Sequence, residues 1–172
     1  MNGAHIHLLL THIPITGTII GVGILVYGLY ANNDSIKKVA LVTFILMAMI
    51  TIPVFLSGEE AEEVVENITG ISEDIIEEHE EFAEKAIWFM GLSGIFSLIS
   101  LFAIIKKLSF ARATTIVALI SSLLTAGFFV RVGFLGGQIQ HSEIRANNTE
   151  FRSEKEKGIK ERHRHDENEA HD

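Results

Sequence analysis

The chain has 172 residues and a net charge of −8, and 48% of its residues are hydrophobic. It contains no cysteine, which excludes disulfides, zinc–thiolate sites and cysteine-ligated iron–sulfur clusters. The acids lie almost entirely outside the apolar stretches, and this acidity argues against nucleic acid as a partner. Such segregation of charged from apolar residues is typical of a membrane protein rather than of a soluble domain.

Apolar stretches long enough to cross a membrane as helices cover residues 8–30, 39–56, 86–105 and 113–135, because a helical span needs about 20 residues. In the first stretch, Gly17 and Gly21 form a small-xxx-small pair, which lets a neighbouring helix approach closely. This stretch follows no basic segment and is too long for the apolar part of a signal peptide, so we expect a retained span.

The segment between the second and third spans is acidic and amphipathic. Acidic side chains crowd residues 59–84, and Lys85 is the only base beside them. Ser57 and Glu60 stand at the spacing of an N-terminal capping box, which predicts that a short helix begins there. His79 shares the apolar side of the following amphipathic run, so we expect its imidazole to point into the protein.

Four spans joined by short turns predict an all-α, integral membrane, up-down-up-down four-helix bundle, with an amphipathic acidic helical connection between helices 2 and 3. We expect one transmembrane domain over residues 1–146 and a charged, mobile C-terminal tail over residues 147–172. The span count alone places several imidazoles and the acidic segment on one side of the membrane. These histidines are His5, His7, His12, His79 and His141.

The opposite side of the membrane receives the two short turns, which are basic. Their charged residues are Lys37, Lys38, Lys106, Lys107 and Arg112, against the single acid Asp34. The positive-inside rule therefore predicts a multi-pass protein of the bacterial inner (cytoplasmic) membrane, with the turns in the cytoplasm. Both termini and the histidine- and glutamate-bearing face would then lie outside.

Imidazole is the commonest metal and haem ligand in proteins, so the clustered histidines are the candidate site. His7 and His12 are five residues apart and would point about 140° away from each other on a helix. Arg131 lies inside the fourth span and needs a partner, either a glutamate of the acidic connection or a haem propionate. Around His79, we expect Glu80 at the edge of the inward face and Glu78 pointing elsewhere.

The opening residues resemble an uncharacterised family of bacterial four-span membrane proteins, whose members typically begin His-Pro-x-x-x-His-Phe-Pro-Ile. The corresponding residues here are His7-Leu8-Leu9-Leu10-Thr11-His12-Ile13-Pro14-Ile15. Shorter similarities are Ser57-Gly58-Glu59, His79, and Leu135-Gly136-Gly137 followed by a histidine. The resemblance covers nearly the whole chain except the tail. Members occur joined to cytochrome c-like or Rieske-like modules, which implies electron transfer through b-type haem held by paired histidines.

Three functions remain open from the sequence. The first is a small membrane redox protein in which b-type haem is ligated by His12 and His79, or by His7 and His141, with Arg131 beside a propionate. The second is a non-haem site for a zinc, iron or manganese ion. Its candidate ligands are His7, His12, Glu59, Glu60, His79, Glu80 and His141. The third is a structural or assembly subunit that needs no ligand.

No catalytic residue is predicted, because no cysteine exists and no serine stands on a recognisable nucleophile turn. The partners expected are the lipid bilayer, a redox protein at the acidic, histidine-bearing face, and further copies of this chain in an oligomer.

Overall fold

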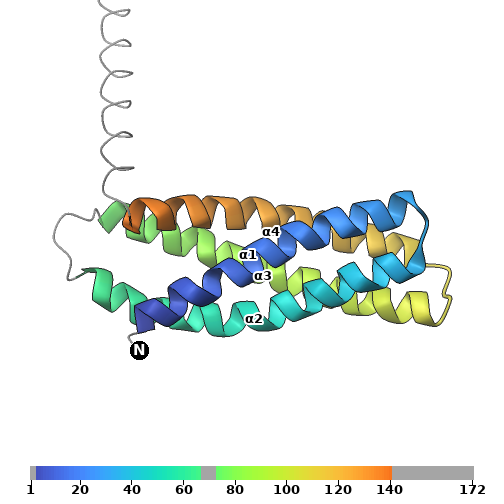
Figure 1. Ribbon diagram of the computed structural model, residues 1–172, viewed down its shortest axis with the longest axis horizontal. Coiled ribbons are helices and arrows are strands. Elements are labelled where there is room, and N and C mark those ends of the chain that lie inside the picture. The colour runs from blue at the N-terminus through green and yellow to red at the C-terminus, as the bar shows by residue number, and fades with distance from the viewer. Residues whose placement is uncertain (1–2, 67–72, 141–172) are drawn as a thin grey trace, which may run out of the picture. The chain divides into compact units, whose positions relative to one another are not determined.

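The computed structural model describes residues 3–66 and 73–140, and it contains four long helices within these ranges. They are α1 (Gly3–Tyr30), α2 (Asp34–Glu66), α3 (Glu73–Ile105) and α4 (Ala111–Gln140). All four include a stretch long and apolar enough to cross a membrane. The prediction of an up-down-up-down membrane bundle is therefore confirmed (Figure 1). The tail predicted from residue 147 lies outside the described residues.

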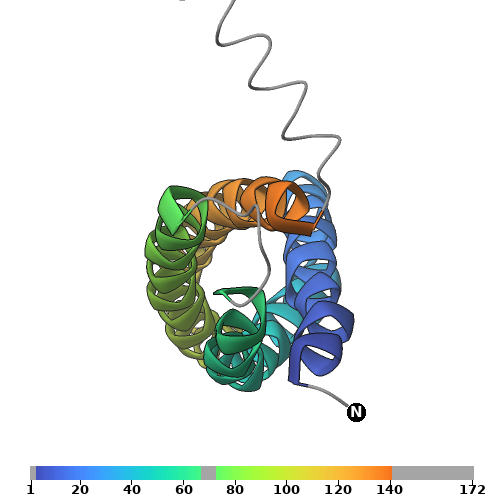
Figure 2. The same ribbon diagram turned by 90° about the vertical axis from the view of Figure 1, so that its left-hand side faces the viewer.

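Within residues 1–135 the helices form a closed ring in the order α1, α2, α3, α4 (Figure 2). α1 and α3 therefore stand diagonally opposite each other, and they meet across the centre where the Thr18 hydroxyl donates to the Met90 sulfur at 3.6 Å. The core around this contact includes Leu25, Leu41 and Phe44, all fully buried. Large apolar side chains on the outside, such as Met49 and Leu98, suit contact with lipid.

Close helix packing depends on small and hydroxyl side chains, because lipid supplies no hydrophobic drive between helices. A Cβ atom built on Gly17 would overlap the Met47 sulfur, so the expected close approach at this glycine exists, and α2 provides the neighbour. Between α3 and α4, hydroxyl groups pair in the buried interior. These pairs are Ser93 with Thr125 at 3.2 Å and Ser100 with Thr115 at 2.6 Å.

Two similar turns join α1 to α2 and α3 to α4. Asn32 and Lys107 each adopt a left-handed backbone, with φ of 48° and 53°. The residue after each donates its N–H back to a carbonyl five positions earlier, at 3.0 Å for Asn33 and 2.9 Å for Leu108. This is the Schellman pattern of helix ends. Asn33 is also the N-cap of α2, since its Oδ1 accepts a hydrogen bond from the Ser35 N–H at 2.9 Å.

The predicted second span, residues 39–56, lies inside α2, which begins at Asp34 and so also contains Lys37 and Lys38. One predicted helix start is wrong. Ser57 lies inside the same continuous helix, so it does not form a capping box with Glu60. Instead the Ser57 hydroxyl donates to the Val54 carbonyl at 2.8 Å, one turn back. The acidic segment thus extends α2 and α3 rather than forming a separate helix before residue 67.

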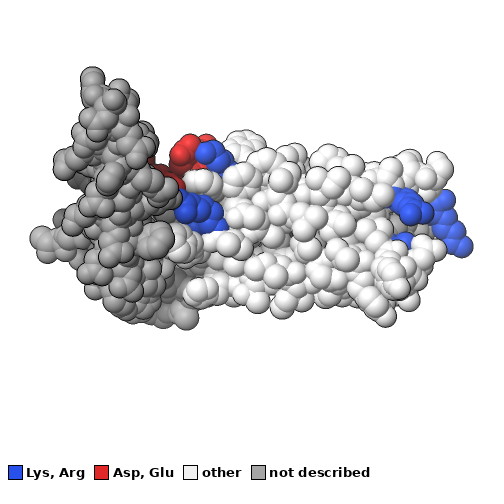
Figure 3. Space-filling model, turned by 90° about the horizontal axis from the view of Figure 1, so that it is seen from above, with Lys and Arg blue, Asp and Glu red and all other residues white. Residues whose placement is uncertain are grey.

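Charged side chains on the described part of the chain gather at the two ends of the bundle. Figure 3 shows one face, where Lys and Arg mark both ends and the long middle carries neither acid nor base. We call the end containing residues 31–37 and 104–112 the turn end. The opposite end, with His7, Ser57, His79 and Arg131, is the histidine end.

Candidate functional site

The histidine end extends beyond the thickness of a bilayer. α3 has 33 residues, which corresponds to about 50 Å of helix against about 30 Å of hydrocarbon. Trp88, 71% exposed, is the side chain on α3 suited to the membrane–water interface. His79 precedes it by more than two helical turns, or about 13 Å. The imidazoles at this end therefore belong to the bundle near the membrane surface rather than to its apolar middle.

His7 is fixed by α2. Its Nδ1 lies 3.0 Å from the Val54 carbonyl oxygen and 3.2 Å from the Ser57 hydroxyl oxygen. A carbonyl only accepts, so Nδ1 carries the proton and donates it. The ring also lies against Gly58, where a Cβ atom would stand 3.5 Å from His7 Cε1. The absence of a side chain at Gly58 leaves room for the imidazole beside the helix backbone.

This hydrogen bond leaves the other nitrogen of His7, Nε2, with its lone pair free in the neutral ring. Burial lowers the pKa of His7 below its ordinary value, while the bond to the Val54 carbonyl opposes that shift. The neutral form is therefore favoured near pH 7. A histidine whose Nδ1–H donates to a backbone carbonyl has the tautomer and orientation that metal-ligating histidines have.

His79 reaches the same region from α3. Its Nδ1 is buried and has no hydrogen-bond partner among the described residues. The ring lies beside the main chain of Val132 and within electrostatic range of His7. The prediction that His79 points into the bundle is confirmed. An unpartnered buried ring nitrogen costs free energy unless something binds it, so this atom needs a ligand or a water molecule.

Arg131 has the glutamate partner that the sequence allowed. Its guanidinium donates to a carboxylate oxygen of Glu78 across the α3–α4 interface, and both side chains are 40% exposed. The ring centroids of Phe82 and Phe134 lie 5.5 and 5.7 Å from the guanidinium carbon, at cation–π distance. The expectation that Glu78 points elsewhere is wrong, because the turn of α3 that presents His79 inward also presents Glu78 to α4.

The remaining predicted ligands do not join the His7–His79 pair in the described part of the chain. His12 and Glu80 are exposed. The side chains of Glu59 and Glu60, and the whole of His141, lie outside the described residues. Among the residues described, no three or more histidine, aspartate or glutamate side chains group as a metal site. The structure thus places His7 and His79 within electrostatic range of each other, a combination that the sequence analysis did not select.

Sequence reasoning missed the features that orient His7, namely the Val54 carbonyl, Ser57 and Gly58. The only available signal was Ser57-Gly58 near the end of the second span, read there as a helix start. The basic turns served in the sequence reasoning only to predict the orientation in the membrane, whereas their residues also line a hollow at the turn end. No known family model, curated protein or solved structure matches the chain, so the resemblance to the four-span family stays a prediction.

Proposed function

We propose that this membrane protein binds a divalent transition-metal ion between His7 and His79. The observation that carries the proposal is the state of the two imidazoles. His7 donates through Nδ1 to Val54 and keeps Nε2 free, and His79 has a buried Nδ1 without a partner. Two neutral nitrogen lone pairs in one region are a starting shell for a metal ion, with water or carboxylates completing the coordination.

The type of metal follows from these donors. Imidazole nitrogens favour zinc, iron, copper or nickel over calcium and magnesium, which take oxygen ligands. Acidic residues are dense in the sequence on either side of the site, at residues 59–84, and a negative field raises the local concentration of cations. A shell with only two protein nitrogens holds an ion exchangeably, which suits capture, sensing or relay of the ion better than a permanent structural role.

A second candidate is b-type haem, and the diagonal placement of the two histidines favours it. His7 belongs to α1 and His79 to α3, two helices that stand diagonally opposite each other in the ring (Figure 2), so both axial ligands of a haem could come from this pair. Against it, Arg131 already pairs with Glu78. A haem propionate would have to compete with that carboxylate for the guanidinium.

The basic turns put the histidine end outside the inner membrane under the positive-inside rule. The proposed site would therefore meet ions or redox proteins on the outer side, beside the acidic segment. An assembly subunit without a ligand is the third function, and it becomes the conclusion if the site binds nothing.

The test is metal analysis and absorption spectroscopy of the full chain, purified in detergent after haem-replete expression. We expect bound zinc or iron without a Soret band, retained by the His12→Ala variant and lost from His7→Ala and His79→Ala. His12 is the matched control because it is an exposed imidazole on the same helix as His7. A Soret band lost with the same two variants would establish haem instead. Metal content equal in all four proteins would refute both ligand proposals.

A further inference from the structure

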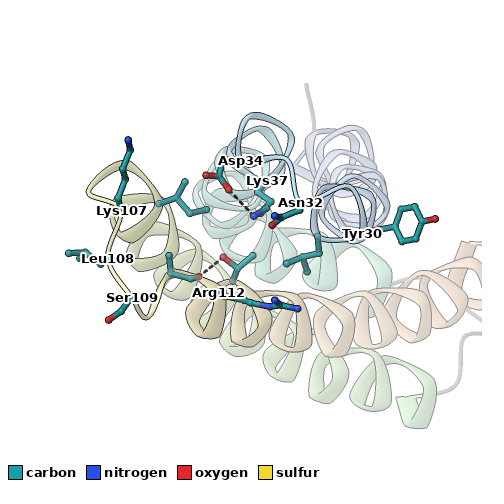
Figure 4. Close-up of a pocket in the computed structure, with 12 residues that line it drawn as sticks. Tyr30, Asn32, Asp34, Lys37, Lys107, Leu108, Ser109 and Arg112 are labelled. Atoms are coloured by element: carbon teal, nitrogen blue, oxygen red, sulfur yellow. Dashed lines mark hydrogen bonds and ion pairs between the residues drawn. The ribbon is translucent and has the colours of Figure 1, made fainter.

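The turn end contains a hollow of about 580 Å³ between the two helical turns. Its walls come from the end of α1, the start of α2, the end of α3 and the start of α4 (Figure 4). Leu29, Ile104 and Leu108 form the apolar part of the lining. Nothing in the proposed metal site uses this hollow. His7 and His79 lie near the N-terminal ends of α1 and α3, whereas the hollow lies at the C-terminal ends of these two helices.

The polar lining is cationic. Lys37, Lys107 and Arg112 line the hollow together with a single carboxylate, that of Asp34. Lys37 is the most enclosed of the three, with a side chain only 12% exposed, and its Nζ lies 2.7 Å from Asp34 Oδ1. In Figure 4, Lys37 points toward Asp34, whereas Lys107 extends outward. One acid does not balance these bases, so the hollow keeps a positive potential.

Backbone features add to this charge. α2 and α4 both begin at the hollow, at Asp34 and Ala111, and helix N-termini carry partial positive charge. The left-handed residues Asn32 and Lys107 both line it as well. A left-handed backbone disfavours a non-glycine side chain. At Lys107 the chain thus keeps a basic residue where glycine would be the easier choice.

We propose that this hollow binds a phosphate-bearing anion, presented by the headgroup of an anionic phospholipid. Arginine and lysine at a helix N-terminus are the groups that recognise phosphate oxygens. The lipid source follows from the surroundings. Tyr30 and Phe110, 88% and 46% exposed, stand at this end at the level expected of interfacial aromatic residues. The apolar wall beside the bases would accommodate the upper part of an acyl chain, as in other basic headgroup pockets of membrane proteins.

The experiment is native mass spectrometry of the full chain in an uncharged detergent, with equimolar phosphatidylglycerol and phosphatidylcholine. We expect phosphatidylglycerol adducts to predominate on the wild type, and Arg112→Gln to weaken that preference about fivefold. The matched control is Lys106→Gln, which removes one positive charge from the same end of the bundle at a residue outside the lining, and it should keep the preference. Arg112→Lys should restore most of it.

A second arm identifies the source of the phosphate. Lipid-free protein is heated with and without millimolar inorganic phosphate, and its melting temperature is recorded. An Arg112-dependent rise with phosphate, together with no lipid preference, would overturn the lipid source and assign free phosphate to the hollow. Equal loss of lipid preference in Arg112→Gln and Lys106→Gln would overturn the site, since only general surface charge would then act. Circular dichroism confirms that each variant is folded.

Discussion

The substitution Gly21→Ala tests whether α1 and α2 pack as closely as the structure shows. A Cβ atom at Gly21 would lie 2.7 Å from Cε1 of Phe44, and the Phe44 ring is fully buried. Carbon atoms pack at about 3.5–4.0 Å. The ring cannot swing outward, so either α1 or α2 has to shift to accommodate the methyl group.

Two opposing terms set the magnitude. Alanine is a better helix residue than glycine by about 0.5–1 kcal/mol. Overpacking a tight core costs about 1–3 kcal/mol. We therefore expect Gly21→Ala to lower the free energy of unfolding by about 1 kcal/mol. Gly23 offers the matched control, because a Cβ there meets nothing within 4 Å. Gly23→Ala should raise the free energy of unfolding by about 0.5 kcal/mol or more.

The assay is unfolding of the detergent-purified protein by increasing mole fractions of sodium dodecyl sulfate, followed by circular dichroism. We expect the free energy of unfolding to change in opposite directions in the two variants, relative to wild type. Comparing the two variants cancels errors that are common to both. If Gly21→Ala proves as stable as Gly23→Ala, the close α1–α2 contact at Phe44 does not exist in the folded protein. The reasoning from backbone spacing would then be wrong.

Three further predictions concern the two ends of the bundle. In a double-mutant cycle of unfolding with Glu78→Gln and Arg131→Gln, we expect a coupling free energy of about 0.5–1 kcal/mol, because the pair is partly exposed. If the two single losses in the free energy of unfolding simply add in the double variant, the side chains do not interact directly. Because burial lowers the pKa of His7 from 6.5, the imidazole takes up a proton at a higher pH in the unfolded chain than in the folded protein. The stability that neutral His7 contributes is thus complete above pH 6.5 and is lost as the pH falls toward the lower folded-state pKa. Denaturation of wild type and His7→Phe across this range should show the loss in the wild type only, and equal pH dependence would refute it. Lys107→Gly should raise the free energy of unfolding by about 1 kcal/mol by relieving the left-handed backbone, whereas Lys106→Gly should lower it; thermal melts showing the same sign for both would contradict this.

The fold could be predicted from the sequence because a membrane imposes simple rules on a chain. Apolar length fixes the spans, and short turns fix their antiparallel order. Helix ends were harder to place. The capping-box spacing at Ser57 is a local signal, and it was overridden because an uninterrupted helix already satisfies the backbone there. Lys37 likewise lies within α2 because Asn33 caps the helix before it.

The site could be predicted only in part, since side-chain direction depends on how each helix is rotated in the bundle. The sequence correctly placed His79 on an inward face, because its apolar neighbours define that face. It could not choose between His7 and His12, which point to different sides of an almost uniformly apolar helix. The structure makes that choice through the Val54 carbonyl and Gly58, both on another helix. Such contacts between distant segments leave no periodic pattern in the chain.

The basic turn residues illustrate the same limit. Lys37 and Arg112 are 75 positions apart in the chain, and their charges indicate an orientation but no shared hollow. Only the packing of the α1–α2 pair against the α3–α4 pair brings both turns together.

The most direct test of the central claim is a cobalt titration of the metal-free protein, followed by the visible d–d bands of Co²⁺. We expect saturable binding of one ion in the wild type and in His12→Ala, displaced by zinc, with loss in both His7→Ala and His79→Ala. Weaker binding as the pH falls through the lowered pKa of His7 should accompany it, since protons compete for the imidazole. Cobalt bands that persist in the His7→Ala and His79→Ala variants, or that never appear in the wild type, would contradict metal binding between His7 and His79.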